Sequence, residues 1–225
     1  RPNIIIIMTD QQRADLRKSC GYELDTMPFL DEWAKEGMDF GRAYTSNPTC
    51  MPARVSMFTG RYSQSHRVRT NHNAGDALYT EDLLDVLKKE GYVTALFGKN
   101  HSHRKPEEFD VFRICGHLGY EGEENRTPEE KAFADFLRET DHMEVHSPSP
   151  GGLTVQHPYR NVSDALEFMD RMEGKGPFFT WISFAEPHNP YQVPEPYFNM
   201  FPPESLPPVR GRKENLEDKG ERFVW

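Results

Sequence analysis

A cysteine, a proline and an arginine follow one another at intervals of two residues, at Cys50, Pro52 and Arg54. A helix is not expected to begin before the cysteine, because a residue that precedes a proline is disfavoured in the helical conformation, and Pro48 and Pro52 both act in this way. We therefore expect Cys50 in a loop at the N-terminus of a short helix, where backbone N–H groups and the helix dipole favour an anion. Arg54 lies within one helical turn of it. The pattern predicts a thiol beside an anion site, and a buried free cysteine near a helix start is the alternative.

Two hard oxygen donors follow the first apolar run of the chain. Residues 3–9 are almost entirely apolar, as buried parallel strands are, and the run ends at Asp10 and Gln11. Open α/β sheets bind their ligands at the carboxyl ends of such strands. A carboxylate and an amide oxygen at adjacent positions suit Ca²⁺ or Mg²⁺. The alternative for Asp10 is a loop acid that caps the next helix.

Lysine and histidine side chains follow two later apolar runs. Lys99 and His101 come after residues 92–97, and His188 comes after residues 177–184. These are again expected strand ends, where ligand sites form. A lone lysine or histidine at such a place usually has no function, and His188 could be a turn histidine between prolines.

A polar stretch, residues 62–73, follows the cysteine segment and contains His66 and Asn71. Its histidine, arginine and asparagine side chains could line a pocket for a substrate anion. The alternative is a solvated loop, because polar residues of these types are mostly exposed.

Amphipathic helices alternate with the expected strands. Helices are predicted where apolar residues recur at helical spacing between capping and stop residues. We expect strands at residues 3–9, 38–44, 92–97 and 177–184. We expect helices at residues 26–37, 81–91, 128–139 and 161–172. This alternation predicts an α/β fold with a largely parallel central sheet and helices on both faces. Residues 187–225, rich in proline and then in charge, are expected to be extended.

Composition excludes several classes of protein. The 225 residues carry a formal net charge of −9, which does not indicate a nucleic-acid partner. No run approaches the 18 or so apolar residues of a membrane span. Three sparse cysteines are not a disulfide framework. The chain begins at Arg1 rather than at methionine, so export cannot be read from its N-terminus.

The cysteine segment resembles the signature of the type I sulfatases, in the alkaline-phosphatase superfamily. Cys50, Pro52 and Arg54, followed after four residues by Thr59-Gly60-Arg61, match C-x-P-x-R-x4-T-G-R without a gap. The resemblance implies the alkaline-phosphatase-like sulfatase fold. It also implies that Cys50 is oxidised to formylglycine (3-oxoalanine), whose hydrated aldehyde is the nucleophile.

The same resemblance implies a metal site. The apolar run that ends in Asp10 and Gln11 is similar to the sulfatase opening, where a strand ends in Asp-Asp or Asp-Gln metal ligands. It makes Asp10, Gln11 and Cys50 ligands of a divalent cation, Ca²⁺ first, with Mg²⁺ or Mn²⁺ as alternatives. Phosphonate monoester hydrolases of the superfamily share the glutamine, so Gln11 does not fix the reaction.

Three further elements are similar to sulfatase motifs. Gly98-Lys-Asn-His101 resembles G-K-x-H, in which Lys99 would bind the sulfate and His101 would contact the formylglycine and assist release of sulfate. Pro187-His-Asn-Pro-Tyr191 resembles the segment whose histidine, here His188, would be the general acid. Residues 59–71 match T-G-R-Y-x-x-x-H-G-x-x-x-N except at Arg67, and imply substrate contacts by His66 and Asn71.

The implied activity is hydrolysis of a sulfate ester, with a sulfated carbohydrate as the first expectation for the substrate. By resemblance the protein would be periplasmic or secreted, and a cytoplasmic location stays open. The second metal motif and the C-terminal subdomain of the family have no counterpart in residues 1–225. We therefore expect the chain to be the N-terminal part of the catalytic domain, inactive without the remainder of the enzyme.

Two other functions remain open. A phosphonate or phosphate ester hydrolase of the same superfamily is one; Lys99 and His101 argue against it, because phosphonate monoester hydrolases carry hydroxyl residues there. A non-catalytic binder of sulfated glycans, in which Cys50 stays a thiol, is the other.

Overall fold

The computed structural model describes residues 1–117, 119–120, 126–141, 143 and 145–208, together with residues 211, 214, 216 and 219. The chain divides into two compact units. The first comprises Arg1–Gln12 and Phe40–Phe198, and the second comprises Arg13–Asp39 and Asn199–Trp225. The second unit contains the short helix α1 (Pro28–Trp33), and every side chain that the sequence nominates for chemistry lies in the first.

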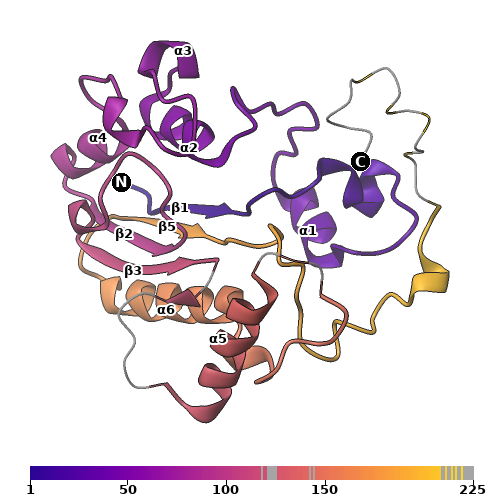
Figure 1. Cartoon of the computed structure of the whole chain (residues 1–225). Coiled ribbons are helices and arrows are strands. Elements are labelled where there is room, and N and C mark those ends of the chain that lie inside the picture. The colour runs from indigo at the N-terminus through magenta and orange to yellow at the C-terminus, as the bar shows by residue number, and fades with distance from the viewer. Residues whose placement is uncertain are drawn as a thin grey trace. The chain divides into compact units, whose positions relative to one another are not determined.

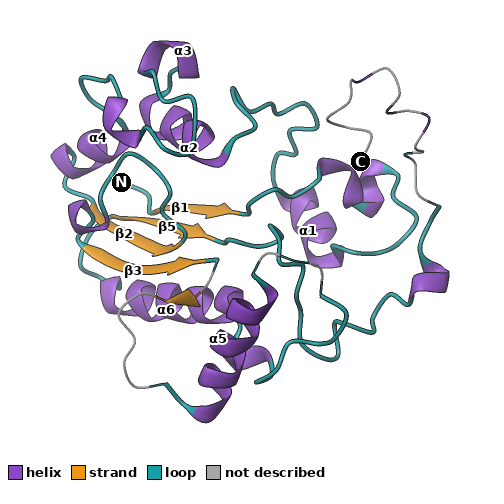
Figure 2. Ribbon diagram, in the orientation of Figure 1, coloured by secondary structure: helices purple, strands orange, loops and turns teal. Residues whose placement is uncertain are grey.

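The first unit is built on a five-stranded sheet in the order β1-β5-β2-β3-β4 (Figure 2). The strands are β1 (Ile4–Met8), β2 (Val93–Gly98), β3 (Val111–Gly116), β4 (Gly119–Tyr120) and β5 (Phe178–Ser183). Strands β1, β5, β2 and β3 are parallel to one another, and the short β4 is antiparallel to β3. The predicted α/β fold with a largely parallel sheet is confirmed.

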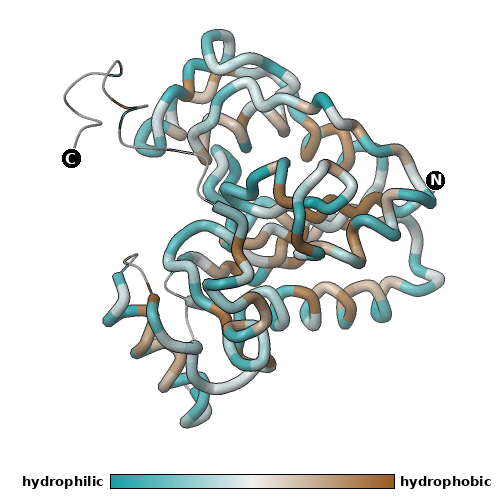
Figure 3. Tube along the Cα trace, turned by 90° about the vertical axis from the view of Figure 1, so that its right-hand side faces the viewer, coloured by the Kyte–Doolittle hydropathy of each residue, from teal (hydrophilic) through white to brown (hydrophobic). Residues whose placement is uncertain are grey.

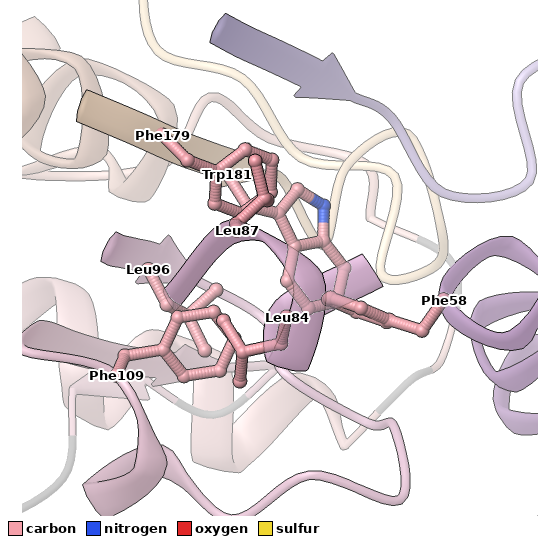
Figure 4. Close-up of a cluster of buried hydrophobic side chains, with 7 residues drawn as sticks. All are labelled: Phe58, Leu84, Leu87, Leu96, Phe109, Phe179 and Trp181. Atoms are coloured by element: carbon pink, nitrogen blue, oxygen red, sulfur yellow. The ribbon is translucent and has the colours of Figure 1, made fainter. Parts of the chain in front are cut away.

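Helices cover both faces of the sheet, as expected. On one face α2 (Cys50–Thr59) and α4 (Leu83–Lys89) contribute to a core cluster with strands β2 and β5 (Figures 1 and 4). The cluster consists of Phe58, Leu84, Leu87, Leu96, Phe109, Phe179 and Trp181.

The opposite face is covered by α6 (His157–Met172), which buries Ala165 and Phe168 against strands β2 and β5. The helix α5 (Pro128–Thr140) packs through Phe133 and Leu137 against Val155. Hydrophobic residues recur along the strand and helix segments of the trace in Figure 3, and the connecting turns are mostly hydrophilic.

Three local expectations differ from the structure. The predicted strand at 38–44 is wrong: this segment is irregular, and Met38, Phe40 and Tyr44 are exposed, so it buries no face. Strand β3 was not predicted, because charged residues surround it. Helix α6 begins four residues earlier than expected, since a proline is tolerated in its first turn.

The proline-rich segment 187–208 has no α-helix or strand in the structure and contains one short 3-10 turn, Pro203–Ser205. Most of the expected charged tail after residue 208 lies outside the described residues. Within the described part of the chain, no helix is both long and apolar enough to cross a membrane.

Candidate active site

Four parallel strands bring polar side chains to one edge of the sheet. Asp10 follows β1, Lys99 follows β2, His117 follows β3 and His188 follows β5. Pairing between β1 and β5 continues past the strands, because the backbone N–H of Asp10 donates to the carbonyl of Glu186 at 3.1 Å. His188 is therefore delivered beside Asp10, at the carboxyl edge where α/β sheets place their sites.

Asp10 is the centre of this group and is 7% exposed. Its Oδ2 accepts hydrogen bonds from Lys99 Nζ at 2.6 Å and from Arg54 at 3.2 Å, and its Oδ1 accepts from Cys50 Sγ at 3.6 Å. Burial by itself would raise the pKa of Asp10, but the hydrogen bonds and charges of Lys99 and Arg54 outweigh it and lower that pKa. Asp10 is therefore an anion between two cations, with one oxygen turned toward the thiol.

Arg54 ties α2 to the strand ends. It is 3% exposed, and one guanidinium nitrogen donates to the carbonyls of Lys99 (2.8 Å) and Asn100 (3.1 Å) and to Ser183 Oγ (2.7 Å). Burial lowers the pKa of Arg54, and the charge of Asp10 opposes this effect. Because the usual pKa of arginine lies far above neutrality, the guanidinium stays charged. The residue expected to help bind an anion thus also fixes Cys50, one turn earlier on the same helix.

A glycine allows Lys99 to reach this position. Gly98 has φ +100°, and a Cβ built on it would lie 2.1 Å from the carbonyl oxygen of Ser183 and 2.8 Å from Asn161 Nδ2. Because that space is empty, the Lys99 N–H donates to the same carbonyl at 2.7 Å. Close approach of β2 and β5 therefore depends on the absence of a side chain at Gly98.

His101 lies on the turn that follows Lys99. Its φ of +44° is uncommon for a residue with a side chain. Burial lowers the pKa of His101, and the positive charges of Lys99 and Arg54 lower it further, so the neutral ring is favoured.

A buried ion pair holds the far end of this turn. Asp82, the N-cap of α4, accepts from Arg104 at 2.9 and 2.7 Å and from His103 at 2.8 Å. Burial would raise the pKa of Asp82, but its hydrogen bonds to His103 and Arg104 hold it well below the usual value. The turn that carries Lys99 and His101 is thereby anchored to α4.

His117 was not nominated from the sequence, yet it belongs to this group. Its Nε2 lies 2.9 Å from Lys99 Nζ, and its ring lies 4.2 Å from that of His188, between centroids. His188 Nδ1 lies 2.8 Å from the carbonyl oxygen of Asn189, which can only accept, so this nitrogen carries a proton. Recognition of β3 as a strand would have placed His117 at the same edge.

Asn71 and His66 support α2. Asn71 Oδ1 accepts from the backbone N–H of Met51 at 3.0 Å, in the first turn of the helix. His66 is fully buried; Nδ1 accepts from the Val68 N–H at 3.1 Å and Nε2 lies 2.9 Å from Ser56 Oγ. Both ring nitrogens are used inside the protein, so the structure does not place His66 in the expected substrate pocket.

A cleft of about 880 Å³ opens beside the cluster. Asp10, Gln11 and Cys50 line it, and Tyr44 and Tyr62 lie on its walls as strongly exposed aromatic residues. The cleft gives the thiol and the acid access to a ligand.

The donor set matches part of a cation site. Single ligand atoms of Asp10, Cys50 and His188 lie within 4.8 Å of one another, and Gln11 lines the cleft beside Asp10 and Cys50. Ca²⁺ and Mg²⁺ take oxygen ligands, whereas sulfur is soft. Residue 50 therefore fits a Ca²⁺ site only if its sulfur is replaced by oxygen, and further oxygens are needed to reach the 6–8 that Ca²⁺ takes.

Comparisons with known proteins agree with this arrangement. The family model described as Sulfatase matches residues 2–206. An arylsulfatase of Clostridium perfringens is 31% identical over 99% of this chain and 51% of its own length, and an ulvan-active sulfatase of Formosa agariphila is 31% identical over 92% of this chain and 39% of its own. The structure of a phosphonate monoester hydrolase of Agrobacterium radiobacter superposes with a TM-score of 0.71 at 24% identity, over 95% of this chain and 47% of its own, and this shows the fold.

The chain thus spans about half or less of the length of these relatives. The family match covers nearly the whole of it and includes the cysteine segment and all four strand ends. The chain belongs to the sulfatase family.

Proposed function

We propose that the chain is part of a sulfuric ester hydrolase whose nucleophile is formylglycine made from Cys50. The observation that carries the proposal is the convergence of Cys50, Arg54, Lys99 and His188 from separate elements on Asp10, beside a cleft that Asp10, Cys50 and Arg54 line. A nucleophile, two buried cations and an imidazole at one point are what transfer of an anionic sulfuryl group requires.

The chain's own residues would act as follows. Lys99 and Arg54 stabilise negative charge on the sulfate and on the nucleophile, and their burial strengthens this effect. His188 donates a proton to the departing alcohol, and His101, which favours the neutral ring, assists release of the bound sulfate. The hydrated aldehyde at position 50 supplies the attacking oxygen once it is formed.

Asp10, Gln11 and residue 50 would hold a divalent cation, Ca²⁺ or else Mg²⁺ or Mn²⁺. Such an ion polarises sulfate oxygens and lowers the pKa of a bound nucleophile. The remaining ligands would come from the rest of the enzyme, which we propose as a necessary partner of this chain.

A sulfated carbohydrate is the proposed substrate. Tyr44 and Tyr62 offer exposed aromatic faces along the cleft, and the ulvan-active relative supports a carbohydrate by its name. An alkoxide leaves poorly, so a sugar sulfate needs the acid that His188 provides. Periplasmic or secreted placement belongs to the same proposal.

Mass spectrometry of the tryptic peptide that contains residue 50, from protein made in the native host, tests the nucleophile. Conversion removes about 18 Da from the cysteine form. The loss should accompany hydrolysis of sulfate esters by the full-length protein. An intact thiol in active protein would refute the mechanism, and an intact thiol in inactive protein would favour a glycan binder.

A phosphonate or phosphate ester hydrolase is the second candidate, because the glutamine at position 11 is compatible with either reaction. Parallel assays of a sulfate monoester and a phosphonate monoester that share one aryl leaving group separate the two activities. A higher kcat/KM on the phosphonate would overturn the sulfatase assignment.

A further inference from the structure

The sequence motifs leave one imidazole of the cluster without a role. His117 follows β3, outside every motif discussed above, and it contacts both Lys99 from the end of β2 and His188 from beyond β5. It is partly buried, and its hydrogen-bond partner Lys99 is 5% exposed.

The contact with Lys99 defines the proton on His117. The ammonium group of a lysine has only donors. His117 Nε2, 2.9 Å away, must therefore accept from Lys99 Nζ. His117 is then a neutral imidazole with its proton on Nδ1, because a cationic ring would present a second donor to an ammonium group.

The same ring also faces His188. The two centroids are 4.2 Å apart and the planes are inclined by 39°, so the rings lie face to face with a moderate tilt. The His188 ring is also held by the carbonyl of Asn189, 2.8 Å from its Nδ1. Rotation of the His188 side chain is therefore restricted by two contacts, one with the backbone and one with the His117 ring.

We propose that His117 is a positioning residue with two separable parts: its Nε2 directs the Lys99 ammonium toward the sulfate, and its ring fixes the orientation of His188. The inference rests on the proposed function of Lys99 and His188. Position matters at this site because a displacement of about 1 Å can cost on the order of 100-fold in rate.

Two substitutions separate the parts. His117→Phe keeps a ring against His188 and removes the acceptor for Lys99, whereas His117→Gln keeps an acceptor and removes the ring. The exposed His72 provides the matched controls, His72→Phe and His72→Gln. All variants are made in the full-length protein after conversion of residue 50 has been checked by mass.

Three quantities are measured: inhibition by inorganic sulfate, and kcat/KM on an aryl sulfate and on a sugar sulfate. His117→Phe should weaken inhibition by sulfate about tenfold, which is the effect expected when a hydrogen bond to a charged group is lost. The ratio of kcat/KM on the aryl sulfate to kcat/KM on the sugar sulfate should change little. His117→Gln should preserve sulfate inhibition and reduce turnover of the sugar sulfate more than that of the aryl sulfate, by about tenfold or more. Equal effects of the two substitutions on all three quantities, or none, would overturn the inference.

One readout does not depend on turnover. Long-range ¹H–¹⁵N NMR spectra of histidine-labelled wild-type protein report which ring nitrogen of His117 carries the proton, with assignment from the His117→Gln spectrum. The Nδ1–H tautomer at neutral pH is expected, and an Nε2–H tautomer or an imidazolium would refute the Lys99 contact. A wild-type protein that shows the Nδ1–H tautomer but hydrolyses no sulfate ester would refute the proposed function while leaving the contact standing.

Discussion

Replacement of Gly98 by alanine should lower the free energy of unfolding and displace Lys99. The added Cβ would lie 2.1 Å from the Ser183 carbonyl oxygen, so β2 and β5 must separate by roughly 1 Å or more at this point. A residue with a side chain also costs about 1–2 kcal/mol at a positive φ such as the +100° of Gly98. Loss of the 2.7 Å bond from the Lys99 N–H adds about 1 kcal/mol. We expect a total loss of about 2–4 kcal/mol in the free energy of unfolding, and a fall in kcat/KM of about 100-fold.

Gly91→Ala is the matched control. Gly91 has φ +75°, and a Cβ there would meet only Arg1 NH1 at 3.8 Å, which is an ordinary contact. Its expected loss is the backbone cost alone, about 1–2 kcal/mol, without an effect on kcat/KM. Denaturant unfolding and steady-state kinetics of both full-length variants give the comparison. Equal losses of stability in the two variants would refute the role assigned to the close approach of β2 and β5.

Three further predictions concern side chains around the site. Asp82→Asn should cost about 3 kcal/mol in unfolding free energy, because it removes the fully buried carboxylate partner of Arg104 and leaves that guanidinium only the more exposed Asp85 and Glu108. Asp135→Asn at an exposed pair should cost under about 1 kcal/mol, and similar losses would contradict the anchor. The NMR titration midpoint of His101 should lie below 6.5 and should rise in Lys99→Met, and a midpoint at or above 6.5 would refute the effect of burial and charge. Because the folded state takes up this proton only at lower pH than the unfolded chain, His101 should reduce stability as the pH falls below about 6.5. His188→Ala should reduce kcat on a sugar sulfate more than on an aryl sulfate, and equal losses would end its assignment as general acid.

Local sequence patterns were sufficient to predict the strands that consist of an uninterrupted run of apolar residues. The run before Lys99 identifies β2, because a strand that is buried on both faces needs apolar residues at consecutive positions. The run before Asp10 also marks a strand, β1, but the expected burial is wrong: β1 lies at the edge of the sheet, and Ile5 and Ile7 are about half exposed. The same argument failed for β3, whose Val111–Gly116 includes an exposed phenylalanine and arginine near the edge of the sheet. It also produced a false strand at 38–44, where exposed aromatic residues imitate a strand pattern.

The residue types that follow each strand, and the position of Cys50 and Arg54 within one helical turn, can be read from the chain alone, because these relations are local. Strand order and register decided the rest. The order β1-β5-β2-β3 makes Asp10 a neighbour of His188 and places His117 beyond Lys99, relations that separations of dozens of residues do not reveal. Burial decided the place of His66, whose ring nitrogens bond inside the fold although its motif indicated the substrate. Spacing along the chain specifies contacts only within one element, and contacts between elements follow from how the apolar faces pack.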